Sequence, residues 1–146
     1  MKGLSVPNSA PSLHHVVFCV YQQNQDQAAA FWRDLGFAFA DIDLPDVGLR
    51  VLLDWDRGIE IISPAENAGP EALDVRDFLR LHGEGVYSVV VRTTDVAGPI
   101  SVAERHGARV DFQQHRGGEG EGYELDEAKL SPIYGMPVTL LATDLN

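Results

Sequence analysis

Residues 13–36 read LHHVVFCVYQQNQDQAAAFWRDLG, a short apolar stretch followed by an amphipathic one. Residues 13–20 are rich in β-branched side chains and predict a strand. Residues 26–35 predict a helix, because apolar side chains recur at helical spacing between Asp26, a candidate cap, and Gly36, a candidate stop. A strand followed directly by a helix indicates a fold that mixes both kinds of element.

The order of a strand, a helix and three strands occurs twice along the chain. In the first half, the strands expected after the helix are residues 37–41, 49–54 and 58–63. A turn-rich stretch at 64–70 and a short helix over 74–81 lead to the second half. There we expect a strand at 86–92, a helix from 94 or 95 to 106, and strands at 109–112, 123–130 and 137–142. The 123–130 segment also suits a helix, and 117–122 (GGEGEG) indicates a flexible acidic loop.

This duplication predicts an α+β fold of two βαβββ modules within one domain, residues 1–146. The modules span about 13–66 and 84–144, with a linker over 67–83. One module alone would expose the apolar face of its sheet, so the halves are expected to pack together or against another chain. We expect mixed sheets that curl around a shared cleft, which is the default place for a small-molecule ligand.

Charge and cysteine content narrow the function classes. The chain has 11 Lys and Arg against 22 Asp and Glu, a net charge of −11, which argues against nucleic acid or an anionic membrane as the partner. No apolar run approaches the length of a membrane span, and residues 1–13 lack the apolar region of a secretory signal. Cys19 is the only cysteine, which favours the cytoplasm and predicts a small buried side chain.

Two polar residues interrupt apolar strand segments. His15 alternates with apolar neighbours, so it shares one strand face with Val17 and Cys19. Glu60 stands inside the run GIEII, where a buried carboxylate must be paired, protonated or bound to a metal. An imidazole nitrogen and a carboxylate oxygen form a reasonable half of a divalent metal site, although a hydrogen-bonded core histidine is the alternative.

Several segments together resemble the vicinal-oxygen-chelate superfamily of glyoxalases, bleomycin-resistance proteins and dioxygenases. They are LHHVVFCV, AAAFWRDLGF and RGIEIISP in the first half and FLRLHGEGVYSVVVRTTDV in the second. The last one is similar to the corresponding segment of methylmalonyl-CoA epimerases. The resemblance covers about residues 13–143 and implies a glyoxalase-like fold and a homodimer.

The resemblance also implies a metal site with two positions substituted. In that superfamily four ligands, from the first and fourth strands of each half, hold a divalent metal such as Co, Ni, Mn, Zn or Fe. Carried over, these positions are His15, Glu60, Ser88 and Thr139. The first two match, whereas the hydroxyls of Ser88 and Thr139 are poor replacements for imidazole and carboxylate. The expected divalent-metal site is therefore incomplete.

Two functions are compatible with this resemblance. The first is an epimerase-like lyase or isomerase, in which Glu60, or Asp46 in LPDVGLR, moves a proton at a carbon beside a polarised carbonyl. The second is a metal-free binding or sequestering protein of the bleomycin-resistance type. Both imply a small-molecule ligand or substrate and a pocket that includes Tyr87, Ser88 and Thr139.

Overall fold

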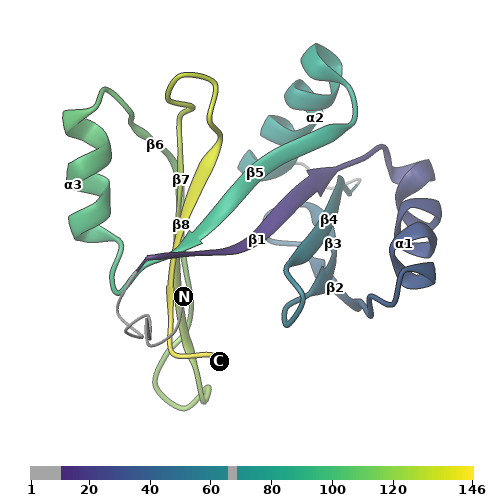
Figure 1. Ribbon diagram of the computed structural model, residues 1–146, viewed down its shortest axis with the longest axis horizontal. Helices are drawn as coiled ribbons and strands as arrows, with labels where there is room; N and C mark the ends of the chain where they lie inside the picture. The colour runs from purple at the N-terminus through teal and green to yellow at the C-terminus, as the bar shows by residue number, and fades with distance from the viewer. Residues whose placement is uncertain (1–10, 66–68) are drawn as a thin grey trace, which may run out of the picture. The chain divides into compact units, whose positions relative to one another are not determined.

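The computed structural model describes residues 11–65 and 69–146, in which the βαβββ order occurs twice (Figure 1). The first repeat comprises β1 (Ser12–Cys19), the 3₁₀ turn η1 (Gln22–Asn24), α1 (Gln25–Asp34), β2 (Ala40–Leu44), β3 (Leu49–Asp54) and β4 (Ile59–Pro64). After α2 (Pro70–His82), the second comprises β5 (Gly85–Arg92), α3 (Ala97–Arg105), β6 (Val110–Gly117), β7 (Glu124–Leu130) and β8 (Val138–Thr143). The predicted α+β fold is confirmed.

These elements form two compact units. One consists of His15–Val89, and the other of the residues up to His14 together with Val90–Asn146. The boundaries fall inside β1 and β5, so each of these strands contributes residues to both units. The single domain and the module limits at 66 and 84 stay predictions.

The sheet of the first unit places His15 and Glu60 on the same face. Its strands follow the order β2-β3-β4-β1, with β1 parallel to β4 and the other neighbours antiparallel. Val17 pairs with Glu60, and Phe18 pairs with Ile61. Because paired residues project from the same face and side chains alternate along a strand, His15, Val17 and Glu60 share one face. Phe18 and Ile61 project from the other.

Helix α1 covers the face opposite to His15 and Glu60. Ala29 of α1 packs in a buried cluster with Leu52 and Ile61 of the sheet. The ring of Trp32, also on α1, lies 5.7 Å from that of Phe18. Burying each large apolar side chain under this helix contributes roughly 1.5–3 kcal/mol. Helix α1 therefore packs on this face of the sheet and leaves the face of His15 and Glu60 free of α1.

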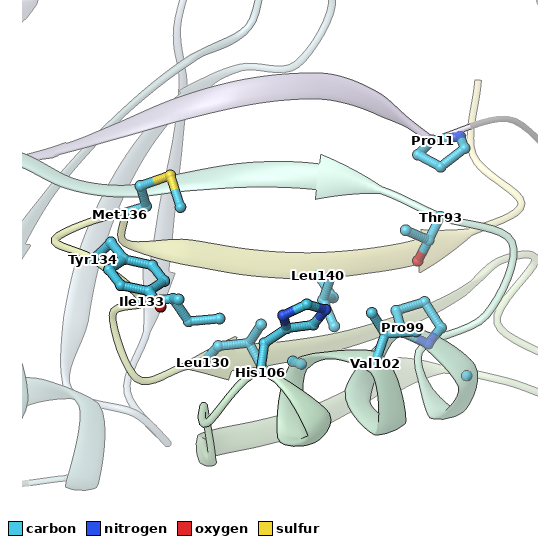
Figure 2. Close-up of a pocket in the computed structure, with 12 residues that line it drawn as sticks. Pro11, Thr93, Pro99, Val102, His106, Leu130, Ile133, Tyr134, Met136 and Leu140 are labelled. Carbon is cyan, nitrogen blue, oxygen red and sulfur yellow. The ribbon is translucent and has the colours of Figure 1, made fainter.

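The second unit has the same construction. Strands β8, β7 and β6 form an antiparallel sheet next to the end of β5. Helix α3 runs beside this sheet (Figure 1) and packs with Ala128 and Leu140, which pair across β7 and β8. Thr139 is next to Leu140 and therefore projects from the face opposite to α3. A pocket of about 710 Å³ opens beside α3 (Figure 2).

Two predicted details of the first repeat are wrong. Strand β2 begins at Ala40 and not at residue 37, because the Ala38 N–H donates to the Asp54 carboxylate at 2.9 Å and not to a neighbouring strand. Helix α1 begins one residue before Asp26, with Asn24 at the cap position. Asp26 instead accepts from the guanidinium of Arg50 at 2.9 Å.

The second repeat shows where pairing overrides local sequence preference. Residues 124–130, which also suit a helix, form β7, and β6 continues to Gly117 instead of ending at residue 112. Strand β6 is longer than expected because residues 112–117 pair one by one with β7 after a bulge. Helix α3 begins at Ala97 with Val96 at the cap position, and not Thr94 or Asp95, although the Asp95 carboxylate accepts the Gly98 N–H of its first turn at 2.9 Å. Helix α2 is longer than the predicted 74–81.

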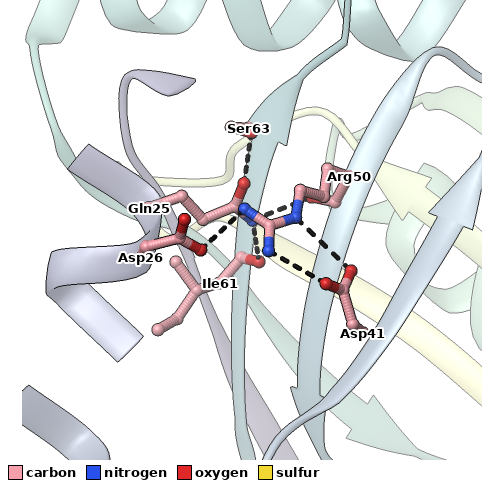
Figure 3. A network of polar contacts seen from close by, with 6 residues as sticks. All are labelled: Gln25, Asp26, Asp41, Arg50, Ile61 and Ser63. Atoms are coloured by element: carbon pink, nitrogen blue, oxygen red, sulfur yellow. Dashed lines mark hydrogen bonds and ion pairs between the residues drawn. The ribbon is translucent and has the colours of Figure 1, made fainter. Parts of the chain in front are cut away.

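A buried amide connects α1 to the sheet (Figure 3). Gln25 is fully buried, and its Nε2 donates to the carbonyl oxygens of Arg50 and Ile61 at 3.0 and 2.9 Å. Its Oε1 accepts from the hydroxyl of Ser63, which is also fully buried. The guanidinium of Arg50 extends the network to Asp41 on β2, which holds the pKa of that carboxyl below its ordinary value. The network positions α1 on β3 and β4.

We predict that Gln25→Leu lowers the free energy of unfolding by about 2 kcal/mol, because it leaves the Ser63 hydroxyl and two carbonyl oxygens without their partner. Urea unfolding followed by circular dichroism measures the change. Gln27→Leu, on an exposed position of α1, is the matched control and should leave stability within about 0.5 kcal/mol. Equal stability of the two variants would show that the network contributes nothing.

Asp54 organises the end of β3. Its carboxylate is 3% exposed and accepts from the backbone N–H groups of Ala38 and Arg57 and from the Arg57 guanidinium. Burial alone would raise the pKa of Asp54, but these donors hold it below the ordinary value. The ionised side chain therefore stabilises the folded state above the unfolded-state pKa of about 3.9, and this stabilisation is lost as the pH falls through the lower folded-state pKa.

We expect Asp54→Asn to be less stable than the natural chain at pH 7, by about 1 kcal/mol. The difference should shrink as the pH falls below about 3.9 and toward the lower folded-state pKa of Asp54, since protonation then removes the charge that Asn lacks. Urea titrations at several pH values measure it. A stability difference that stays constant over this range would contradict the assignment.

Candidate functional site

The candidate site starts from His15, a buried polar side chain in the middle of β1. Its exposed fraction is 4%, and it shares its strand face with the apolar side chains of Val17 and Cys19. The ring of Trp55, from the turn between β3 and β4, lies 6.2 Å from the imidazole at 43° between planes. A buried imidazole requires polar partners, so its surroundings decide what it does.

Glu60 is the partner that the structure provides. His15 Nε2 and Glu60 Oε1 are 3.2 Å apart, and Glu60 is 19% exposed. The contact follows from the β1–β4 register. Glu60 lies opposite Val17, and Val17 is two residues from His15 on the same strand face. The sequence pattern indicated both residues, and the structure brings them together. The pair combines a buried imidazole with a carboxylate that is partly exposed to solvent, an arrangement suited to accepting a proton.

The other two positions carried over from the superfamily hold buried hydroxyls. Ser88 on β5 is 1% exposed and Thr139 on β8 is 6% exposed. Among the residues that the structure describes, there is no group of three or more His, Cys, Asp or Glu side chains arranged to hold a metal ion. One imidazole and one carboxylate do not fit the donor set that a divalent metal needs.

Tyr87 contacts helix α2. Its ring is 5% exposed and packs edge-on against Phe78 at 5.4 Å between centroids, and its hydroxyl donates to the carboxylate of Asp74. Burial, with the charge of Glu71 and the bond to Asp74, raises the pKa of Tyr87 well above its ordinary value. The predicted pocket role of Tyr87 remains a prediction, whereas its contact with α2 is a structural role that the sequence did not indicate.

Asp46, the second candidate base, lies away from the pair along the sheet. It is exposed in the turn between β2 and β3. That turn leads into β3 at Leu49. Glu60 pairs with Leu53, which is four residues further along β3 than Leu49. Four residues of strand correspond to about 13 Å. A catalytic role of Asp46 stays a prediction.

A second imidazole–carboxylate pair lies on the hairpin of the other unit. His115 on β6 and Asp126 on β7 are register partners, with Nδ1 and Oδ1 2.7 Å apart. The bond to Asp126 raises the pKa of His115. Only the strand pairing identifies Asp126 as the partner of His115. Both side chains are about half exposed, so this pair lacks the enclosure of the first.

Comparison with known families and structures agrees with this architecture. The model of the Glyoxalase/Bleomycin resistance protein/Dioxygenase superfamily matches residues 12–129. No functionally curated protein matches the chain in sequence. None of the helices in the described part of the chain is long and apolar enough to cross a membrane.

Solved structures show the same fold at low sequence identity. A hypothetical protein from Bacillus halodurans C-125 superposes with a TM-score of 0.70 at 18% identity, covering 94% of this chain and 97% of its own. Methylmalonyl-CoA epimerase from Streptomyces coelicolor, in complex with 2-nitronate-propionyl-CoA, gives 0.68 at 20% identity, with 91% and 97% covered. A 4-hydroxymandelate synthase from the same organism gives 0.65 at 15% identity, with 93% of this chain and 50% of its own covered.

Cys19 shares the strand face of His15 but is sealed from solvent. It is fully buried, as expected from the sequence. Burial raises the pKa of its thiol to about 11, against the opposing effect of backbone hydrogen bonds from Gly85 and Cys19 itself. Because the thiolate is the reactive form, this thiol should be inert in the folded protein.

We predict that Ellman's reagent at pH 8 modifies the native chain about 100-fold more slowly than the chain in urea. The unfolded chain should release one equivalent of chromophore, because Cys19 is the only cysteine. Fast modification of the native protein would show that this end of β1 opens readily to solvent.

Proposed function

The chain belongs to the Glyoxalase/Bleomycin resistance protein/Dioxygenase superfamily, and from this premise we propose that it is a small-molecule lyase or isomerase acting at a carbon beside a carbonyl. The observation that supports this most directly is the 3.2 Å contact between His15 and Glu60. The named activities of two structural neighbours, an epimerase and a synthase, make enzymes the first class to test.

Glu60 is the group that reaches the substrate. At 19% exposed it is more accessible than His15 at 4%, so its carboxylate is the base that removes the proton from the carbon. The electron pair of the broken C–H bond passes to the carbonyl oxygen, which gives an enolate. The resulting glutamic acid then returns the proton to the same carbon. If the planar enolate has first turned its other face toward Glu60, this return gives the isomer. General base catalysis of this kind contributes about 10²–10⁴-fold in rate.

His15 is a positioning residue in this proposal. Its Nε2 lies against one oxygen of Glu60 and holds the carboxylate in a single orientation on the sheet. Orientation by a neighbouring group matters because proton transfer requires hydrogen-bonding distances. Substitution of His15 should therefore change the rate and its pH dependence without removing the base.

The metal that the superfamily implies does not enter this proposal. The described residues present two of the four expected donors, with hydroxyls at Ser88 and Thr139. We expect titration with Co²⁺ to show no stoichiometric uptake, because one His and one Glu form only half a site. A homodimer and a cytoplasmic location, both implied by the resemblance, also remain proposals.

A metal-free binding protein is the second candidate. The observation in its favour is that both superfamily ligand positions in the second half carry buried neutral hydroxyls. Such groups anchor a ligand by hydrogen bonds and supply no acid, base or Lewis acid. In that case His15 and Glu60 would be polar anchors of the ligand.

Deuterium exchange distinguishes the two candidates. The chain is incubated in D₂O with methylmalonyl-CoA, and separately with pyruvate, and mass spectrometry follows deuterium at the carbon beside the carbonyl. We expect exchange above the uncatalysed rate with at least one compound. Glu60→Gln should lower it about 100-fold, and His15→Gln about 10-fold with an altered pH profile.

Glu104→Gln is the control, since Glu104 is an exposed carboxylate on α3, and it should match the natural chain. Exchange that survives Glu60→Gln would exclude Glu60 as the base. A thermal shift with methylmalonyl-CoA but no exchange would support the binding protein instead.

A further inference from the structure

The two repeats end their first helices in the same way. Gly36 follows α1 and Gly107 follows α3, both with positive φ, at 108° and 92°. In the first repeat the N–H groups of residues 35 and 37 both donate to the carbonyl oxygen of Trp32. In the second, those of residues 106 and 108 both donate to the carbonyl oxygen of Ala103. Trp32 and Ala103 are therefore structurally equivalent.

At this position the first repeat is filled by aromatic rings. The indole of Trp32 meets Phe37 at 5.0 Å and Phe31 at 5.5 Å, both edge-on, and Phe18 of β1 at 5.7 Å. Edge-on and tilted contacts at these distances are favourable aromatic geometries. These four rings therefore fill the contact between α1 and the sheet.

The second repeat has small side chains at the same positions. Ala103 replaces Trp32, Val102 replaces Phe31, and Ala108 replaces Phe37. Val102 and Ala103, the counterparts of Phe31 and Trp32, line a pocket of about 710 Å³ between α3 and the sheet, together with Leu130 and Leu140. Its volume is within the range of about 300–1,000 Å³ found for small-molecule sites.

The lining determines the class of molecule that this pocket fits. Figure 2 shows the ring of His106 in the middle of the pocket, with Tyr134 and Met136 at one end and Pro11 and Thr93 at the other. No Lys, Arg, Asp or Glu is among the residues that line it. An anionic ligand would find no neutralising cation there, and the net charge of −11 adds repulsion. An uncharged apolar molecule is complementary to the pocket.

We propose that this pocket binds an uncharged aromatic molecule, which occupies the space that Trp32 and its ring partners fill in the first repeat. The site lies within the second unit and is separate from His15 and Glu60, which belong to the first. Tyr134, 93% exposed and held in a turn by the bridge between Ile133 and Met136, is available to cover the ring at the rim.

The test uses the uncharged fluorophore N-phenyl-1-naphthylamine with the full chain. We expect saturable binding, seen as a rise in emission, and displacement by indole or naphthalene. Ala103→Trp supplies from the chain itself the ring that the pocket lacks, so it should weaken binding at least about tenfold. Its melting temperature should not fall, because the new indole fills existing space.

Ser101→Trp is the matched control, because it adds the same indole at an exposed position of α3 and should bind like the natural chain. Met136→Glu is a second variant. Met136 is 54% exposed, so this variant should fold normally and still bind weakly, because it places a charge at the apolar rim. Binding that is unchanged in both Ala103→Trp and Met136→Glu would overturn the proposal.

Two results would assign the pocket to another occupant and overturn the proposal. If a dimer in sedimentation velocity dissociates in Ala103→Trp, a second copy of the chain covers the pocket. If deletion of residues 1–10 raises probe affinity about tenfold or more, the chain's own N-terminal segment competes for it, since this segment leads directly into Pro11 at the rim.

Discussion

The parallel pairing of β1 with β4 is the constraint on which the candidate site depends. It sets Val17 opposite Glu60 and so brings Glu60 within 3.2 Å of His15 on the next step of the same face. A shift of the register by one residue would move Glu60 to the face that α1 covers, where its carboxylate would replace Ile61 among apolar side chains. The apolar cluster under α1 therefore penalises any register that is shifted by one residue, and in this way it keeps Glu60 on the face of His15.

The buried polar groups around this sheet act in the same direction. Gln25 joins the first turn of α1 to two strands, and Asp54 satisfies backbone donors at the end of β3. Each group is buried with its hydrogen bonds made, which costs little, whereas a displaced register or helix would leave several donors and acceptors unpaired. Hydrogen bonding thus specifies the arrangement that hydrophobic burial stabilises.

The internal duplication explains both what the halves share and where they differ. Both have a helix that ends at a positive-φ glycine and packs on one sheet face. At the positions that the superfamily uses for metal ligands, the first repeat carries His15 and Glu60 and the second carries Ser88 and Thr139. Beside the first helix, the first repeat has the rings around Trp32, and the second has a pocket lined by Ala103.

The sequence by itself determined the element order, the α+β class and the face of β1 on which His15 lies. These properties depend on local periodicity, since alternation and helical spacing are visible in a single segment. It also identified Glu60 as a carboxylate out of place in an apolar run. Sequence was weaker where pairing outweighs propensity, as in β7 and in the extension of β6.

Only the tertiary structure decided which groups meet. The register between β1 and β4 made His15 and Glu60 a pair and left Asp46 at the far end of the β3–β4 hairpin. Packing placed the Tyr87 hydroxyl against Asp74. The small side chain of Ala103 lines a pocket only because α3 packs on its sheet. The physical reason is that such contacts join residues distant in the chain, and their free energies depend on register and packing that no single segment contains.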